Sequence, residues 1–122
     1  MQAETEVIPS EHESFKWLLE ALCDELVEVH GDPANEDASW IRVVTDSRIV
    51  RAGDVFVALS GERTDGHRYL LQAAESGAFC LVVEHVETGL NVPQLVVENS
   101  RRAYGLIARA WRRRFGIALT AV

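Results

Sequence analysis

Several features that mark whole classes of protein are missing from this sequence. No run of about eighteen apolar residues occurs, so no ordinary transmembrane helix is predicted. The acidic N-terminus, MQAETEVIPSEHESF, has neither the basic nor the apolar region of a signal peptide. We therefore expect a cytoplasmic protein with no membrane partner.

The sequence is also poor in metal-binding patterns. Its two cysteines, Cys23 and Cys80, lack CxxC spacing, which is typical of reduced, buried thiols and not of a disulfide framework or a zinc site. His12, His30 and His85 are scattered, with no carboxylate or cysteine at ligand spacing. No metal site is predicted.

Length and charge limit the remaining possibilities. A chain of 122 residues that is 48% hydrophobic can build one core but not two. The net charge of −7 is uneven, because residues 1–39 hold eleven acidic residues against Lys16, whereas residues 40–122 hold eleven arginines against eight acidic residues. The mildly basic second part favours an anionic small ligand such as a nucleotide diphosphate, and the acidic first part disfavours nucleic acid.

The first forty residues are predicted to form an arm and a helix. Residues 1–12 read as a flexible arm. Ser10 and Glu13 have the spacing of a capping box, and apolar residues then recur at helical spacing, which predicts a helix over roughly residues 13–27. An acidic, turn-rich connection follows before a strand near residues 41–44. The apolar face of the helix would hold Phe15, Leu18, Leu19, Leu22 and Leu26.

Strands and helices alternate along the rest of the chain. Apolar runs predict strands at 55–59, 79–84 and 92–97, and the first of these suits a strand buried on both faces. A helix over 67–76 would end at Gly77, and Asn99 or Ser100 would cap a longer helix. This order predicts a small three-layer α/β domain with a mostly parallel sheet flanked by helices. The buried faces of the two helices would hold Tyr69, Leu70, Ala73 and Ala74, then Ala103, Leu106, Ile107, Ala110 and Trp111.

The last helix is rich in arginine, which allows two interpretations. A basic patch could bind nucleic acid. However, these arginines lie opposite an apolar stripe, and too few exposed aromatic residues accompany them for base stacking, so a solvated helix face is favoured. We predict no nucleic-acid partner. The arginines concerned are Arg101, Arg102, Arg109, Arg112, Arg113 and Arg114.

Residues 45–67, TDSRIVRAGDVFVALSGERTDGH, place two polar loops around one buried strand. Ligands of parallel sheets bind beyond the carboxyl ends of the strands, and both loops follow strands directly. This stretch resembles the signature of the N-terminal substrate-binding domain of the Mur ligases, which build the peptide stem of bacterial cell-wall precursors. The resemblance covers residues 41–122 and includes TDSR, AGDVFVAL, GERTDGH and the SGA turn.

Within the family, the chain is most similar to the MurF branch, which adds D-alanyl-D-alanine to UDP-MurNAc-tripeptide. The MurE branch, which adds the third stem residue, is second. In these ligases an apolar strand leads from the substrate-binding domain into the ATPase loop TGxxGKT, and IALTAV at residues 117–122 stands in the place of that strand. Residues 13–122 are therefore expected to be a UDP-MurNAc-peptide-binding domain, truncated before the central ATPase domain.

The resemblance also implies which residues bind the substrate. Thr45 and Ser47 match the positions that hold the uracil and ribose, where a hydroxyl can donate and accept hydrogen bonds. Arg48 could offer its guanidinium to the diphosphate. The second nucleotide-contacting loop would comprise Gly61, Glu62, Arg63 and Thr64.

The residues themselves leave plainer alternatives open. Asp46 can simply cap a turn, and Arg48 can be exposed to solvent or paired with Asp54. His67 follows Asp65 and Gly66, so a structural hydrogen bond or an N-terminal helix position is predicted for it, and no proton transfer. The two glycines, Gly61 and Gly66, are predicted to serve the backbone conformation.

The resemblance implies an ATP- and Mg²⁺-dependent carboxylate–amine ligase as the full-length protein. This chain has no GxxxxGK[ST] motif, so it should bind no cofactor, be inactive alone and anchor the UDP-sugar. The expected partners are UDP-MurNAc-peptide and the central and C-terminal domains of the same ligase, in a monomer. A free-standing nucleotide-sugar-binding module, or a protein-interaction domain that docks through its acidic N-terminal helix, is the alternative.

Overall fold

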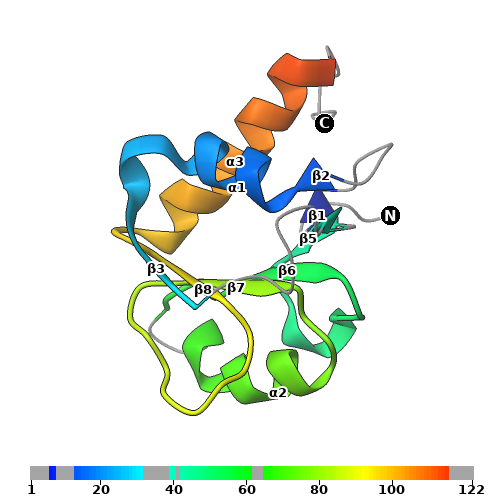
Figure 1. The fold of residues 1–122 in the computed structure, drawn as a ribbon, viewed down its shortest axis with the longest axis vertical. Coiled ribbons are helices and arrows are strands. Elements are labelled where there is room, and N and C mark those ends of the chain that lie inside the picture. The colour runs from blue at the N-terminus through cyan, green and yellow to red at the C-terminus, as the bar shows by residue number, and fades with distance from the viewer. Residues whose placement is uncertain (1–5, 8–12, 32–38, 41, 62–64, 116–122) are drawn as a thin grey trace.

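A computed structural model describes residues 6–7, 13–31, 39–40, 42–61 and 65–115. Figure 1 shows a sheet in the middle of the molecule, with α1 (Phe15–Leu22) and α3 (Ser100–Phe115) on one side and α2 (Leu70–Glu75) on the other. The predicted three-layer α/β architecture is confirmed.

Four parallel strands form the centre of the sheet. In spatial order they are β5 (Arg42–Val44), β6 (Asp54–Val57), β7 (Cys80–Val83) and β8 (Gln94–Val97). Each starts and ends within about two residues of its predicted position. Every residue of β6, β7 and β8 is buried, since other elements cover both faces, and this explains why their sequences are near-continuous apolar runs.

Both edges of the sheet come from the first thirty residues. β1 (Glu6–Val7) pairs antiparallel with β5, and β3 (Leu26–His30) pairs antiparallel with β8. The sheet order is β1-β5-β6-β7-β8-β3. Residues 6–7 of the predicted arm are thus a strand, and the helix predicted to reach residue 27 ends at Leu22. Residues 27–30, VEVH, alternate apolar and polar, which is strand periodicity.

The start of α1 also differs from the prediction. Ser14 Oγ accepts a hydrogen bond from the Trp17 backbone N–H at 3.1 Å, so the helix begins at Phe15. Ser10, the predicted capping residue, lies outside the described residues. The cap residue itself belongs to β2 (Glu13–Ser14), which pairs with β4 (Ser39–Trp40) in a separate two-stranded sheet.

The other helix ends follow the sequence more closely. Asn99 Oδ1 accepts from the Arg102 backbone N–H at 2.9 Å, so Asn99 is the cap of α3. Gly77 has a φ of +99° after α2, the left-handed conformation predicted for it. The first part of the predicted 67–76 helix is a 3₁₀ helix, η4 (Gly66–Tyr69). The predicted strand at 117–122 and Ile41 lie outside the described residues.

The sheet divides the hydrophobic core of the domain into two layers, one on each face, and alternate strand residues fill them. Val43, Val55 and Val57 pack on the α1 and α3 side, while Val44 and Phe56 pack on the α2 side. Full burial of side chains of this size contributes about 1.5–3 kcal/mol each. The helices complete these two layers with Leu18, Leu22, Ile107 and Trp111 on one side and with Leu70 and Ala73 on the other.

The two cysteines lie in different environments. Cys80 in β7 is fully buried, as predicted, and burial raises the pKa of its thiol far above the ordinary range. Cys23 is exposed, so the prediction of a buried thiol is wrong there. It ends α1 with a positive φ of 48°, and its Sγ donates to the Glu20 carbonyl at 2.9 Å.

Candidate functional site

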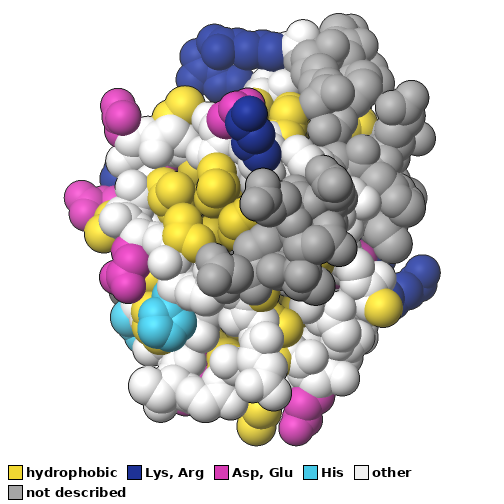
Figure 2. Space-filling view, in the orientation of Figure 1, with side chains coloured by type: hydrophobic (Ala, Val, Ile, Leu, Met, Phe, Trp, Pro, Cys, Tyr) yellow, Lys and Arg dark blue, Asp and Glu magenta, His cyan; other side chains and the backbone are white. Residues whose placement is uncertain are grey.

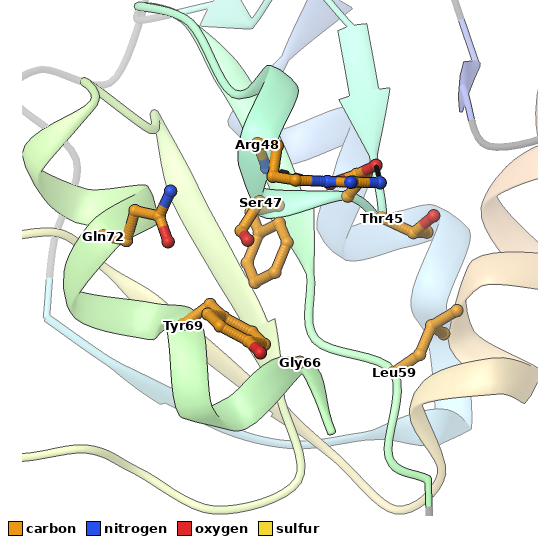
Figure 3. A pocket seen from close by; sticks show the side chains of 9 residues that line it. Thr45, Ser47, Arg48, Leu59, Gly66, Tyr69 and Gln72 are labelled. Carbon is orange, nitrogen blue, oxygen red and sulfur yellow. Dashed lines mark hydrogen bonds and ion pairs between the residues drawn. The ribbon is translucent and has the colours of Figure 1, made fainter. Parts of the chain in front are cut away.

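A pocket of about 540 Å³ opens beyond the carboxyl ends of β5 and β6. This volume lies within the range of about 300–1,000 Å³ usual for small-molecule sites, and the position is the one expected for a parallel sheet. Three segments form it: residues 45–48 after β5, the end of β6 with the residues that follow it, and η4 with α2 (Figure 3). Its lining residues are Thr45, Asp46, Ser47, Arg48, Phe56, Leu59, Gly66, Tyr69 and Gln72.

The first loop contains the 3₁₀ helix η3 (Ser47–Ile49), which Asp46 caps. Asp46 Oδ1 accepts from the Arg48 backbone N–H at 2.9 Å, and the Arg48 guanidinium closes on both carboxylate oxygens at 3.0 and 2.8 Å. The side-chain hydrogen bond from Arg48, followed by the backbone one, holds the pKa of Asp46 below its ordinary value. The predicted capping role of Asp46 is therefore confirmed.

Arg48 stays at the surface although it is paired. Its side chain is 83% exposed, which confirms the solvent-exposed alternative, whereas pairing with Asp54 is wrong because Asp54 binds Arg42. An exposed ion pair of this kind is weak, since water competes for both charges. The guanidinium can therefore turn toward an anionic ligand at the pocket mouth without a large loss.

Thr45 and Ser47 line the same pocket as Arg48. Thr45 is half-buried, Ser47 is buried, and both line the pocket. Figure 3 shows Ser47 facing the space between η3 and α2, with Thr45 farther along the same wall. The structure thus brings Thr45, Ser47 and Arg48 together at one pocket.

Six of the nine lining residues were not among the predicted substrate-binding residues: Asp46, Phe56, Leu59, Gly66, Tyr69 and Gln72. Phe56 and Leu59 are apolar lining residues, and Figure 3 shows Tyr69 and Gln72 on the side of η4 and α2, across from η3. Tyr69 was expected on the buried face of its helix, yet 38% of it is exposed. Leu70 and Ala73 alone fill that buried face as predicted, with Ala74 half-buried. The spacing of three residues between Tyr69 and Gln72, which places them on one helix face, is a signal that could have found them.

Of the second predicted loop, residues 61–64, the structure describes Gly61 alone. Gly61 is exposed and does not line the pocket, and Glu62, Arg63 and Thr64 lie outside the described residues. Leu59 and Gly66, which lie on either side of this loop, do line the pocket. The Gly66 N–H donates to the Leu59 carbonyl at 2.9 Å. A Cβ on Gly66 would lie 2.9 Å from Ala58 Cα, so this glycine is required by the close approach of the backbone and not by the backbone conformation that was predicted to require it.

His67 makes the structural hydrogen bonds predicted for it. Its Nδ1 lies 2.7 Å from Asp65 Oδ1, and its Nε2 accepts from the Glu84 backbone N–H at 2.9 Å. The hydrogen bond from the His67 backbone N–H, and then the one from its ring, hold the pKa of Asp65 below its ordinary value. The His67 ring also stacks on His85, with centroids 4.4 Å apart.

Five arginines of α3 lie on a solvated face, and the side chain of Arg114 lies outside the described residues. Arg101, Arg102, Arg109, Arg112 and Arg113 are all exposed, while Ala103, Ile107 and Trp111 are buried. Figure 2 shows Lys and Arg side chains gathered near the end of the molecule where α3 finishes. A second cavity of about 490 Å³, between α1 and α3, shares no lining residue with the first.

None of the described helices is long and apolar enough to cross a membrane. Within the same residues, no group of three or more His, Cys, Asp or Glu side chains could hold a metal ion.

Comparison with known proteins places these features in a family. A profile described as "Mur ligase family, catalytic domain" matches residues 42–112. The UDP-N-acetylmuramoyl-tripeptide--D-alanyl-D-alanine ligase of Synechocystis sp. is 40% identical over 90 residues, which cover 72% of this chain and 20% of that protein. The UDP-N-acetylmuramoyl-L-alanyl-D-glutamate--2,6-diaminopimelate ligase of Bradyrhizobium diazoefficiens is 47% identical over 77 residues, 63% of this chain and 16% of that protein.

Solved structures agree with the sequence comparison. A UDP-N-acetylmuramoylalanyl-D-glutamyl-2,6-diaminopimelate--D-alanyl-D-alanyl ligase from Acinetobacter baumannii matches with a TM-score of 0.74 and 31% identity, over 93% of this chain and 24% of that one. The chain therefore spans a quarter or less of the length of these relatives. Because the family profile matches more than half of its 122 residues, the chain belongs to the Mur ligase family.

Proposed function

We propose that this chain is the UDP-MurNAc-peptide-binding domain of an ATP-dependent Mur ligase of the cytoplasm. In this proposal, the pocket beyond β5 and β6 holds the uridine diphosphate end of the substrate. The observation that carries the proposal is the convergence of two hydroxyl side chains and an exposed guanidinium, from Thr45, Ser47 and Arg48, on one pocket in a member of this family.

The chemistry of the lining suits a uridine nucleotide. Uracil and ribose present donors and acceptors, and the hydroxyls of Thr45 and Ser47 can serve either. The half-exposed ring of Tyr69 offers a flat surface on which a base can stack. Arg48 supplies the positive charge for the diphosphate at the mouth of the pocket.

In this proposal the domain contributes binding and orientation. Anchoring the nucleotide end would hold the distant reacting carboxylate in place, which makes the bond-forming step effectively intramolecular. ATP and Mg²⁺ do not fit here, because the chain has no phosphate-binding loop and its described residues contain no metal-ligand cluster. We assign both to the central and C-terminal domains of the same monomeric ligase.

Two branches of the family are candidates for the full-length activity. We favour the MurF type, which adds D-alanyl-D-alanine to UDP-MurNAc-tripeptide, because the solved D-alanyl-D-alanyl ligase from A. baumannii matches 93% of this chain with a TM-score of 0.74. The 47% identity with the diaminopimelate ligase of B. diazoefficiens supports the MurE type as the second candidate. Both types would use this domain in the same way.

An NMR titration of the ¹⁵N-labelled chain with UDP-MurNAc-tripeptide tests the proposal. We expect weak binding, with localised amide shifts at Thr45 to Arg48 and at residues 59–67. Ser47→Ala, Arg48→Ala and Thr64→Ala should each weaken binding. Arg51→Ala, which removes an exposed arginine that does not line the pocket, is the matched control and should bind as the parent does. A flat titration at millimolar ligand would contradict the proposed site.

A further inference from the structure

A hydrogen-bonded cluster lies next to the pocket but contributes none of its lining. Its centre is Glu84, which directly follows β7. Glu84 Oε2 accepts from the Ser60 hydroxyl at 3.1 Å, from the Ser100 backbone N–H at 2.8 Å and from the Ser100 hydroxyl at 3.0 Å. The Ser100 hydroxyl in turn accepts from the Ser60 backbone N–H at 3.2 Å. The three residues therefore form a closed ring that joins the ends of β6 and β7 to the first turn of α3.

The carboxylate is held in its charged form. Burial acts to raise the pKa of Glu84, but the hydrogen bonds from the Ser100 backbone, the Ser100 hydroxyl and the Ser60 hydroxyl together outweigh it. The pKa therefore lies below its ordinary value. Because one oxygen already accepts three hydrogen bonds, this group is built to hold neighbouring segments in place.

The backbone of the same residue fixes a second segment. The Glu84 N–H donates to His67 Nε2, so that nitrogen carries no hydrogen and the neutral ring bears its proton on Nδ1. Nδ1 then donates to Asp65. Only 7% of the His67 side chain is exposed, so water competes little for these bonds. Residue 84 thus holds Ser60 through its side chain and His67 through its backbone.

The two segments held in this way carry one wall of the pocket. Leu59 precedes Ser60, Gly66 precedes His67, and both Leu59 and Gly66 line the pocket. Their backbones are joined by the Gly66 N–H to Leu59 carbonyl bond, so the two segments move together. A displacement of either anchor would shift this wall relative to Thr45, Ser47 and Arg48 on the opposite side.

We propose that Glu84 and His67 are positioning residues, which set the wall formed by Leu59 and Gly66 at the distance from residues 45–48 that the ligand requires. The identity of the ligand in this inference rests on the proposed function. Neither residue lines the pocket. Their effect on binding acts through the backbone of the two segments they hold.

The test compares four variants by NMR titration with UDP-MurNAc-tripeptide. Glu84→Gln keeps the shape of the side chain but replaces one carboxylate oxygen by a donor, and should weaken binding about tenfold. His67→Ala should have a similar effect, and His67→Gln, whose carbonyl can accept from the Glu84 N–H, should recover part of the loss. Glu87→Gln is the matched control, because the side chain of Glu87 is exposed and does not belong to the cluster.

The pattern of shifts separates positioning from general destabilisation. In Glu84→Gln, ligand addition should still shift the amides of Thr45 to Arg48, while the shifts at Leu59, Ser60 and Gly66 diminish. Parent-like affinity in both Glu84→Gln and His67→Ala would overturn the inference. An equal loss of shifts on both walls would also overturn it, because that outcome means a purely structural role. If Glu84→Gln does not fold, the two His67 variants decide.

A measurement without ligand keeps this inference distinct from the proposed function. The backbone amides of Ser60 and Gly66 are both hydrogen-bonded, so their hydrogen exchange reports on the two held segments. Exchange at both should be faster in Glu84→Gln and unchanged at Thr45 to Arg48. If the parent fails to bind the ligand, the proposed function is wrong, and these two amides still decide the positioning role. Unchanged exchange at both would overturn it.

Discussion

Arg42 and Asp54 join the first two parallel strands through their side chains at the end of the sheet away from the pocket. Arg42 Nε lies 3.0 Å from each carboxylate oxygen of Asp54, and the two residues are also register partners of β5 and β6. Only 1% of the Asp54 side chain and 13% of the Arg42 side chain are exposed. Asp54 also accepts from the Arg51 backbone N–H at 2.8 Å. A buried and well-bonded pair of this kind is sensitive to the loss of one partner.

Asp54→Ala should therefore destabilise the chain strongly. It removes the carboxylate that balances the largely buried guanidinium of Arg42, which costs about 3–5 kcal/mol in the free energy of unfolding. Urea denaturation measures this. Asp46→Ala is the control, since it breaks a pair whose arginine is 83% exposed, and its effect should be much smaller. Equal losses in the two variants would contradict the role given to the Arg42–Asp54 pair.

Two glycine-to-alanine changes should have opposite signs. In Gly66→Ala, the new Cβ meets backbone atoms of Ala58 and Leu59 at 2.9 Å, so the segment must shift, and we expect a loss of about 1–3 kcal/mol. Gly105 lies in α3, and a Cβ added there would meet nothing within 4 Å. Gly105→Ala should add about 0.5–1 kcal/mol through helix propensity. Thermal unfolding of both variants checks the pair, and a neutral Gly66→Ala would refute the close approach.

Tyr69→Ala should weaken binding of UDP-MurNAc-tripeptide about tenfold, because stacking of a base on an aromatic ring contributes about 1–3 kcal/mol. Tyr69→Phe keeps the ring and should bind nearly as the parent does. Leu71→Ala is the control from the same helical segment, since Leu71 is 57% exposed and does not line the pocket. Calorimetric titration gives the affinities. If Tyr69→Ala and Leu71→Ala bind alike, the base does not stack on this ring.

Lowering the pH should weaken the hydrogen bonds by which Glu25 and Glu84 hold α3. The hydrogen bond from the Arg102 side chain holds the pKa of Glu25 below its ordinary value, and burial offsets this effect only in part. The pKa of Glu84 is also below its ordinary value. A lowered folded-state pKa gives a stabilisation that is fully present above the ordinary value, near 4.5, and is lost as pH falls through the folded-state value. The free energy of unfolding should therefore fall below about pH 4.5, and less steeply in Glu25→Gln/Glu84→Gln. Parallel pH profiles for parent and variant would argue against this.

The two thiols should differ in reactivity. Cys23 is exposed and should react with a thiol-specific reagent in the folded chain, whereas buried Cys80 should react only after unfolding. Burial raises the pKa of the Cys80 thiol, which suppresses the thiolate further. Mass spectrometry counts the labels, and Cys23→Ser should remove the one formed under native conditions. A second label on the folded chain would show that β7 opens readily.

The parts of the fold that the sequence predicts are those whose local pattern and tertiary surroundings agree. β6 and β7 are uninterrupted apolar runs because both of their faces are covered, and Gly77 stands where the chain turns after α2. β3 was missed because Leu26 continues the helical spacing of Phe15, Leu18 and Leu22, although it pairs with Val97 across the sheet. A spacing pattern cannot reveal a partner about seventy residues away.

Of the pocket, the sequence predicted the part that is contiguous along the chain. Thr45, Ser47 and Arg48 form one short polar loop directly after a strand, so their sequence order already brings them together. Tyr69 and Gln72 belong to a later helical segment, and only the crossover from β6 places that segment beside the loop. Glu84 was not singled out because its hydrogen-bond partners, Ser60 and Ser100, are separated from it by 24 and 16 residues.

The origin of the two edge strands has a consequence for folding. β1 shields β5 and β3 shields β8, so a single N-terminal segment closes the sheet at both sides. Pairing Leu26 with Val97 closes a long loop, a slow kind of contact to form, and the far edge of the sheet should therefore be completed late. Until that moment, nascent chains expose the backbone of β8, a hydrophobic template on which neighbouring molecules can assemble.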